Sequence, residues 1–234
     1  MNTTEFLDIA TAICPDKTAI VFEDERYTFS QLNERVNRLA NGLIKIGVKK
    51  GDRVALLQVN CNQCVETYFA VARVGAIYLP LNFRAKDKEL AYMLNTADCE
   101  TIIAGDRYIP MVKAIQPEVK TLKNIITLET KQEGLPHYDD IIASSPDTEI
   151  ETQVDDHDTT ILMYTAGTTG FPKGVMLSHT SFSGYVMENV TPADPDSTEA
   201  NILTVPLYHV AGIQAMMAAI YGGRTLVMER QFEP

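Results

Sequence analysis

The sequence predicts an α/β fold, a layered α/β sandwich in which helices cover mostly parallel β-sheets. Strand-like and helical patterns alternate over residues 53–128, as in successive strand–helix–strand units. Residues 53–59 form a nearly continuous apolar run, typical of a strand buried on both faces. The 234 residues, 45% apolar and 22% charged, can bury a substantial core. We therefore expect one large domain over residues 1–234, with candidate sub-lobes 1–150 and 151–234.

The N-terminal region predicts a helix, a hairpin and a second helix. The first helix covers Thr3–Ile13, and the apolar and β-branched segments 19–22 and 27–29 predict a two-stranded hairpin. Ser30 is the predicted N-cap of the next helix, whose apolar residues recur every three or four positions until Gly47 ends it.

The middle of the chain predicts a parallel sheet. The expected strands are 53–59, 76–79, 101–104 and 124–128, and the expected helices between them are 61–74, 88–96 and 111–115. Each strand–helix–strand unit implies a right-handed crossover.

Residues 165–174, Thr-Ala-Gly-Thr-Thr-Gly-Phe-Pro-Lys-Gly, lie between two strand-like segments and predict a phosphate-holding loop. Glycine permits positive φ and close approach of backbone N–H groups to an anion, the threonines supply hydroxyls, and Lys173 supplies a positive charge. In a Walker A loop, Gly precedes the Lys, Ser or Thr follows it, and a helix starts at once; here Pro172 precedes and Gly174 follows. The alternative is an ordinary Gly/Thr-rich hairpin loop.

After this loop, the pattern continues with Ser178 as the predicted cap of a helix over 179–189. A strand over 201–205, a helix through Ile220 and a last strand over 224–228 follow. His209 lies where the first of these strands ends and the helix opens, which is where ligand sites of α/β sheets lie. His137 and His179 have no such context and are expected at the surface or as caps, and His157 lies in an acidic linker.

The composition limits the function. A net charge of −11 argues against nucleic acid or an anionic membrane as partner. No apolar run is long enough to span a bilayer and no N-terminal signal core is present, so a cytoplasmic location is the expectation.

The cysteines, at 14, 61, 64 and 99, do not resemble a disulfide framework. Cys61 and Cys64 form a CxxC pair at a predicted helix start, which keeps redox or metal chemistry as an alternative. No second Cys/His pair stands at zinc spacing, so no metal ligands are assigned.

Residues 164–175, with Ser178 and His179 after them, resemble the signature loop of the adenylate-forming superfamily, which includes acyl-CoA synthetases, adenylation domains of peptide synthetases and luciferases. Ala166 stands where these enzymes usually carry Ser. Segments 51–54, 75–82 and 89–92 resemble the N-terminal half of acyl-CoA synthetases and are attributed to turns and core packing.

The resemblance implies a two-step reaction. A carboxylate attacks the α-phosphorus of ATP to give an acyl-adenylate and pyrophosphate, and a thiol, commonly coenzyme A, then displaces AMP. Mg²⁺ and Lys173 would neutralise charge during the first step. The residues expected to hold the phosphates are Thr165, Ala166 through its backbone, Gly167, Thr168, Thr169, Gly170 and Lys173.

The segment Pro206–His209 resembles the part of the family that lines the acyl pocket, so Tyr208, His209 and Gly212 are the expected substrate-binding residues. His209 and Lys173 are the expected catalytic residues. An apolar or aromatic carboxylic acid is the expected small-molecule partner.

Full members of the family are more than twice as long, and their later motifs for Mg²⁺, the ribose and a mobile C-terminal domain with a further Lys are not found here. The chain is therefore expected to be the N-terminal part of an AMP-binding domain, inactive or feeble alone. A nucleotide-binding scaffold without turnover and a peptide-synthetase adenylation domain remain alternatives. The latter usually has an Asp for the substrate amine, and no acidic residue lies between His209 and Glu229, which favours a simple acid. Self-association of the chain is left open.

Overall fold

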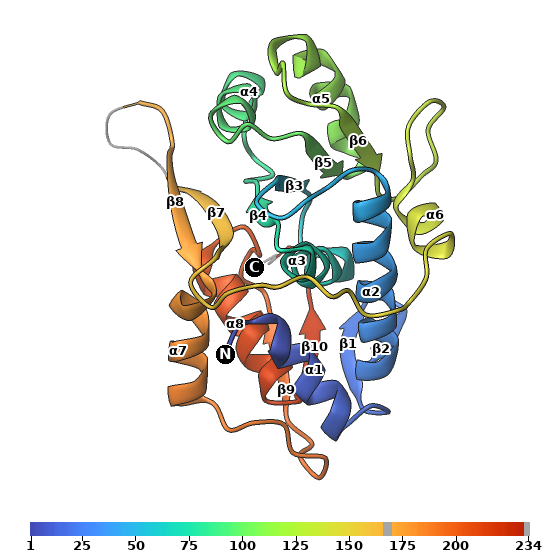
Figure 1. Ribbon diagram of the computed structural model, residues 1–234, viewed down its shortest axis with the longest axis vertical. Helices are drawn as coiled ribbons and strands as arrows, with labels where there is room; N and C mark the ends of the chain where they lie inside the picture. Colours follow the sequence, from blue (N-terminus) through green and yellow to red (C-terminus); the bar gives the residue numbers. More distant parts are fainter. Residues whose placement is uncertain (166–169, 232–234) are drawn as a thin grey trace.

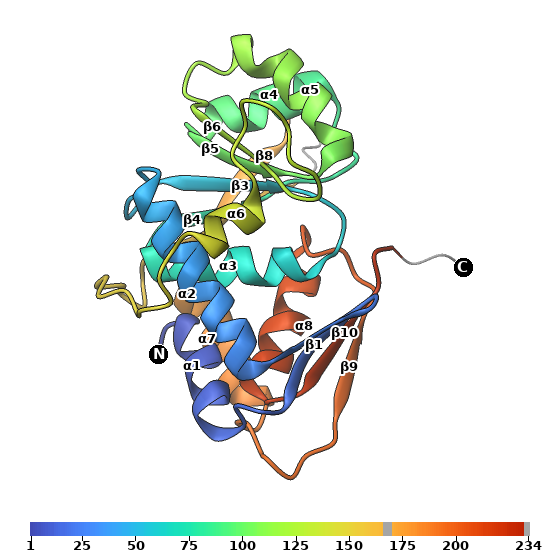
Figure 2. The ribbon, with the colours of Figure 1, turned by 90° about the vertical axis from the view of Figure 1, so that its right-hand side faces the viewer.

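The structure, a computed structural model, describes residues 1–165 and 170–231 as two β-sheets with helices between and around them (Figures 1 and 2). The α-helices are α1 (Thr4–Ile13), α2 (Phe29–Lys45), α3 (Asn62–Val74), α4 (Asp87–Thr96), α5 (Ile109–Ile115), α6 (Tyr138–Ala143), α7 (His179–Asn189) and α8 (Val210–Tyr221). Short 3-10 turns flank α5, at Asp106–Tyr108 and Gln116–Glu118. The strands are β1 (Thr18–Phe22), β2 (Glu25–Thr28), β3 (Arg53–Leu57), β4 (Ile77–Pro80), β5 (Thr101–Ala104), β6 (Asn124–Thr127), β7 (Thr159–Thr165), β8 (Lys173–Ser178), β9 (Ala200–Leu203) and β10 (Thr225–Met228).

Most neighbouring strands run parallel, which confirms the predicted α/β class. The six-stranded sheet has the order β6-β5-β3-β4-β7-β8, and only its β7–β8 hairpin is antiparallel. The four-stranded sheet has the order β2-β1-β10-β9, with only β2 antiparallel to its neighbour. Both sheets combine strands from before and after residue 150, so the division considered at that residue coincides with neither sheet.

The helices form layers around the six-stranded sheet, as Figure 2 shows: α4 and α5 cover its outer face, while α2 and α3 lie between the two sheets. In β3, Ala55 and Leu57 belong to the hydrophobic core under α4 and α5, whereas Val54 and Leu56 belong to the core between the sheets. Because side chains alternate between the faces of a strand, a strand with a core on each side must be apolar throughout. This explains the unbroken apolar run in the sequence.

Helix α3 is buried between the sheets and carries a charged residue in the interior. The carboxylate of Glu66, fully buried, accepts hydrogen bonds from the Arg35 guanidinium of α2 at 2.9 and 3.0 Å. It also accepts from the hydroxyl of Tyr138 in α6 at 3.0 Å and from the amide of Asn62 at 2.8 Å. A buried charge is tolerated only when it is paired and hydrogen-bonded, and this arrangement meets both conditions.

A second polar cluster joins α1, α3, β7 and α7. The Tyr68 hydroxyl lies 2.5 Å from Thr3 Oγ1 and 3.3 Å from Thr160 Oγ1. The Thr3 N–H donates to Nδ1 of His179 at 3.2 Å. The prediction of His179 as a surface or capping residue is wrong, since its side chain is buried against these groups, and burial lowers the pKa of His179 to about 4.

The start of α2 also differs from the prediction. Thr28, not Ser30, is the N-cap: its hydroxyl accepts from the Gln31 N–H at 3.2 Å, and the Gln31 side chain accepts from the Thr28 N–H at 2.9 Å. This reciprocal capping box forms because β2 ends at Thr28 and the helix begins with the next residue. Helix α6 was not predicted; it is short, and its first residue, Tyr138, is held by the distant Glu66.

The CxxC pair lies at the start of α3, with Cys61 and Cys64 as buried free thiols whose sulfur atoms are 3.5 Å apart. Burial raises the pKa of the Cys61 thiol well above its usual value, which disfavours the reactive thiolate. The redox alternative therefore gains no support.

Replacing Glu66 by Gln should lower the free energy of unfolding by about 3 kcal/mol, because Arg35 would lose its buried counter-ion and keep only the exposed Asp139, at 3.5 Å. The matched control is Glu34→Gln. Glu34 pairs with Arg38 within α2 and its side chain is 50% exposed, so this change should cost less than about 1 kcal/mol. Urea denaturation measures both losses, and equal values would contradict a structural role for the buried pair.

The stability of the protein should fall as the pH is lowered from about 6.5 towards 4, because the unfolded chain binds the His179 proton more tightly than the folded chain does. At about 1.4 kcal/mol per pKa unit, the difference between 6.5 and about 4 amounts to roughly 3 kcal/mol, present above pH 6.5 and lost towards pH 4. Between about pH 7 and about pH 5 roughly 2 kcal/mol of this should be lost, so urea denaturation at these two pH values should show that loss in the wild type and much less of it in His179→Asn. The variant His157→Asn, changed at an exposed position, should lose as much stability as the wild type over this pH range. A loss of the same size in His179→Asn would refute the assignment of the pH dependence to His179.

Candidate functional site

The predicted phosphate loop is carried by a β-hairpin. Strand β7 ends at Thr165 and β8 begins at Lys173, and these two residues are direct partners in the antiparallel ladder. The Thr165 hydroxyl donates to the Lys173 carbonyl at 3.4 Å. The loop is therefore followed by a strand, as predicted, and not by the helix of a Walker A loop.

Within the loop, Gly170 has φ +120°, and a Cβ added there would meet no atom of residues 1–165 and 170–231 within 4 Å. That backbone conformation favours glycine. The predicted residues Ala166, Gly167, Thr168 and Thr169 lie outside the described residues.

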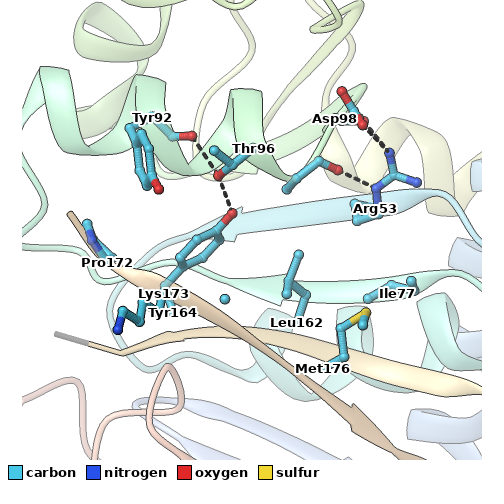
Figure 3. A pocket seen from close by; sticks show the side chains of 12 residues that line it. Arg53, Ile77, Tyr92, Thr96, Asp98, Leu162, Tyr164, Pro172, Lys173 and Met176 are labelled. Carbon is cyan, nitrogen blue, oxygen red and sulfur yellow. Dashed lines mark hydrogen bonds and ion pairs between the residues drawn. The ribbon is translucent and has the colours of Figure 1, made fainter. Parts of the chain in front are cut away.

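The C-terminal part of the loop is fixed to α4. The ring of Phe171 stacks on Tyr92 with centroids 4.6 Å apart and an interplanar angle of 27°. The Tyr164 hydroxyl donates to the Met93 carbonyl at 3.0 Å and lies 2.5 Å from Thr96 Oγ1, and burial raises the pKa of Tyr164. Figure 3 shows Tyr164 reaching from the hairpin to α4. The hairpin end is thus held on both sides of the loop.

A cavity of about 290 Å³ lies beside the hairpin and brings together three of the predicted site residues, Thr165, Tyr208 and His209, with Pro172. The ring of Tyr208 lies 4.1 Å from that of His209 and packs edge-on against Phe83 at 5.3 Å. His209 is the residue directly before α8 and is exposed. This juxtaposition joins segments more than forty positions apart in the sequence.

Gly212, also predicted to bind substrate, is not among the residues that line this cavity. It lies in the first turn of α8, where a Cβ would come within 2.4 Å of the Pro206 carbonyl oxygen. The structure therefore places Gly212 where α8 packs closely on the preceding loop.

Sequence reasoning missed part of the cavity lining. Pro80, Asn82, Glu89 and Met93 face it from the end of β4 and from α4, although the first three were attributed to turns and core packing. The signal that could have found them is topological. Strands β4 and β7 are parallel neighbours, so the residues that follow β4 share an edge of the sheet with Thr165.

A larger, more open cavity of about 600 Å³ adjoins the first, between α4 and the β7–β8 hairpin (Figure 3). Lys173 lines this one, while Tyr164 and Pro172 line both. Lys173 is exposed and has no ion-pair partner among residues 1–165 and 170–231. The hairpin end therefore offers an uncompensated positive charge next to a small, partly apolar cavity.

Among residues 1–165 and 170–231, no group of three or more His, Cys, Asp or Glu side chains is arranged to hold a metal ion. Over the same ranges, no helix has the length and apolar character needed to cross a membrane.

The chain is similar to known proteins in sequence and in fold. Residues 7–234 match the family of AMP-binding enzymes. A crotonobetaine/carnitine–CoA ligase of Salmonella heidelberg (strain SL476) is 30% identical over 244 residues, which cover 99% of this chain and 47% of the ligase. The chain thus spans about half the length of the curated relatives it matches.

Two solved structures show the same fold. The anthranilate CoA ligase AuaEII, in complex with anthranoyl-AMP, superposes with a TM-score of 0.93 and 25% identity, covering 99% of this chain and 45% of that one. The inhibitor-bound N-terminal domain of FACL13 from Mycobacterium tuberculosis gives a TM-score of 0.88 and 27% identity, covering 99% and 58%. The fold is that of the N-terminal domain of acyl-CoA synthetases, and the chain belongs to the AMP-binding enzyme family.

Proposed function

We propose that this chain forms the ATP-loop part of a carboxylic acid–CoA ligase, which makes an acyl-adenylate from ATP and then a thioester. The observation that carries the proposal is the position of the loop-bearing hairpin. Its end, at Thr165 and Lys173, adjoins the 290 Å³ cavity that contains Tyr208 and His209. An acid in that cavity would lie next to a nucleotide held by the loop.

The first step joins two anions, so charge must be neutralised locally in a protein whose net charge is −11. The exposed ammonium of Lys173 and the Thr165 hydroxyl would bind phosphate oxygens, together with backbone N–H groups of the loop. The backbone of Gly170, at φ +120° and without a side chain, supports this assignment, because a phosphate could approach it closely. These groups support ATP as the proposed ligand of the hairpin.

Mg²⁺ is expected to accompany ATP as its phosphate complex. The described part of the chain supplies no group of three ligands for it. Coenzyme A is proposed as the thiol because the relatives named above are CoA ligases. On its own the chain is proposed to turn over feebly, since it spans about half the length of those relatives.

The acid is proposed to be small and apolar or aromatic. The cavity, at about 290 Å³, lies just below the usual range for ligand pockets, about 300 to 1,000 Å³. Pro80, Met93 and Met163 provide apolar walls, and Tyr208 and His209 provide rings that could contact the acyl group.

One observation keeps amino acids under consideration as substrates. Glu89 lines the cavity, so a carboxylate is present there even though none occurs between His209 and Glu229 in the sequence. An acid that carries an amine could pair with it. Substrate tests should therefore include amino acids.

Lys173→Ala should weaken ATP binding by roughly 10- to 100-fold, the loss expected for a hydrogen bond to a charged group. Isothermal titration with ATP measures the affinity and does not require turnover. Lys123→Ala is the matched control: Lys123 is also exposed beside a strand but pairs with Glu100, away from the hairpin. Similar affinities for both variants and the wild type would remove Lys173 from the site.

ATP–pyrophosphate exchange should depend on a carboxylic acid, and Tyr208→Ala should raise the KM for that acid roughly tenfold while changing the KM for ATP less than twofold. The control Tyr185→Ala removes an exposed tyrosine of α7 and should change neither value. A panel of aliphatic, aromatic and amino acids identifies the substrate. Tight ATP binding without exchange for any acid would favour the alternative of a nucleotide-binding module without turnover.

A further inference from the structure

Asn60 is a buried polar residue, 3% exposed, in the connection between β3 and α3. Its side-chain oxygen accepts a hydrogen bond from the Leu207 N–H at 2.8 Å. Its side-chain NH₂ donates to the carbonyl of Val205 at 3.1 Å and to that of Glu229 at 3.2 Å. All three partners are backbone groups more than a hundred positions away along the chain.

These bonds join the two sheets at the candidate site. Asn60 follows a strand of the six-stranded sheet, whereas Val205 follows β9 and Glu229 follows β10 of the four-stranded sheet. Figure 2 shows the connection from β3 to α3 and the connection from β9 to α8 passing close to one another.

The bonds hold the backbone on both sides of Pro206, immediately before Tyr208 and His209. The other contacts of this segment are local or apolar. The His209 N–H donates to the Pro206 carbonyl at 3.0 Å, and Gly212 packs against the same carbonyl. Neither contact fixes the segment relative to the six-stranded sheet, which carries the phosphate-loop hairpin. The packing of Tyr208 on Phe83, which follows β4, ties the segment to that sheet through a side chain, whereas the Asn60 bonds tie its backbone.

An asparagine is well suited to this position because the site presents one donor and two acceptors. A carboxylate could accept from Leu207 but would face two carbonyl oxygens, and an apolar side chain would leave all three backbone groups without this partner. The Asn60 amide therefore satisfies all three backbone groups, which neither an apolar nor a charged side chain would do.

We propose that Asn60 is a positioning residue for the acid-binding cavity. By holding the backbone around Pro206 it sets the place of Tyr208 and His209 relative to the hairpin end at Thr165. The expected effect of Asn60 on binding of the acid rests on the function proposed above, but its expected effect on the position of His209 does not. Asn60 itself does not line the cavity and is not expected to touch substrate.

The experiment compares Asn60→Ala and Asn60→Asp with Asn37→Ala. Asn37 is also buried, 4% exposed, and its amide oxygen accepts from Arg73 at 2.6 Å, so its removal costs stability without touching the Val205–Leu207 backbone. Two-dimensional ¹H–¹³C NMR of the four histidine rings reports on His209, with the exposed His157 as an internal reference. Thermal unfolding of each variant measures the general loss of stability.

The His209 ring resonance should shift in both Asn60→Ala and Asn60→Asp, because each variant loses the donor to Val205 and Glu229, and it should stay in place in Asn37→Ala. In ATP–pyrophosphate exchange the Asn60 variants should raise the KM for the acid roughly tenfold and the KM for ATP less than twofold. Should Asn60→Ala fail to fold, Asn60→Asp gives the same comparison.

An unmoved His209 resonance in a folded Asn60 variant overturns the proposal, as does an equal shift in Asn37→Ala. If the wild type shows no exchange with any acid, the proposed function fails, yet the NMR comparison still decides whether Asn60 positions His209.

Discussion

The ion pair between Glu66 and Arg35 is the interaction on which the layered arrangement depends. Helix α3 lies between two sheets and has no face towards solvent along most of its length, so every polar group on it must find a partner inside the protein. Glu66 finds partners on α2 and α6, and Arg73 finds Asn33 and Asn37 of α2, each at 2.6 Å, with Asp8 of α1 as its counter-ion. One buried helix thereby fixes three others.

The position of α3 in turn determines where a site can form. The helix joins β3 to β4, and in a parallel arrangement the strands β3, β4 and β7 all end at the same edge of the six-stranded sheet. Asn60 follows the first of these strands, Asn82 the second, and the third ends at Thr165. The loop before α8 approaches the same edge from the other sheet, which completes the cavity with Tyr208 and His209. The candidate site is thus a consequence of strand direction rather than of any single motif.

The charges of the protein are arranged in keeping with this site. A net charge of −11 makes most of the surface unfavourable for binding a polyphosphate, so a binding site needs a local positive charge. The hairpin provides one, because Lys173 follows Pro172 directly and no described carboxylate pairs with it. Membership of the AMP-binding enzyme family agrees with a nucleotide at this place, and the adjoining cavity agrees with a second, smaller substrate.

Features that depend on near neighbours in the chain could be predicted from the amino-acid sequence. The apolar runs predicted the parallel strands, glycine and threonine with Lys173 predicted the strand-flanked loop, and the end of a strand before a helix singled out His209. Each of these is a local pattern of propensity or turn chemistry. The assigned roles of Lys173 and His209 stay predictions.

Which residues meet depends on how the layers pack in the folded protein. Thr28 caps α2 in place of Ser30 because the hairpin ends one residue earlier than its pattern suggests, and His179 is buried where it accepts a hydrogen bond from Thr3, far away in sequence. Glu89 and Asn82 line the cavity together with residues many tens of positions away in the sequence. Asn60 links the two sheets through contacts of the same long range. The type and spacing of residues do not predict such long-range partners, because burial and hydrogen bonding depend on how whole layers pack together.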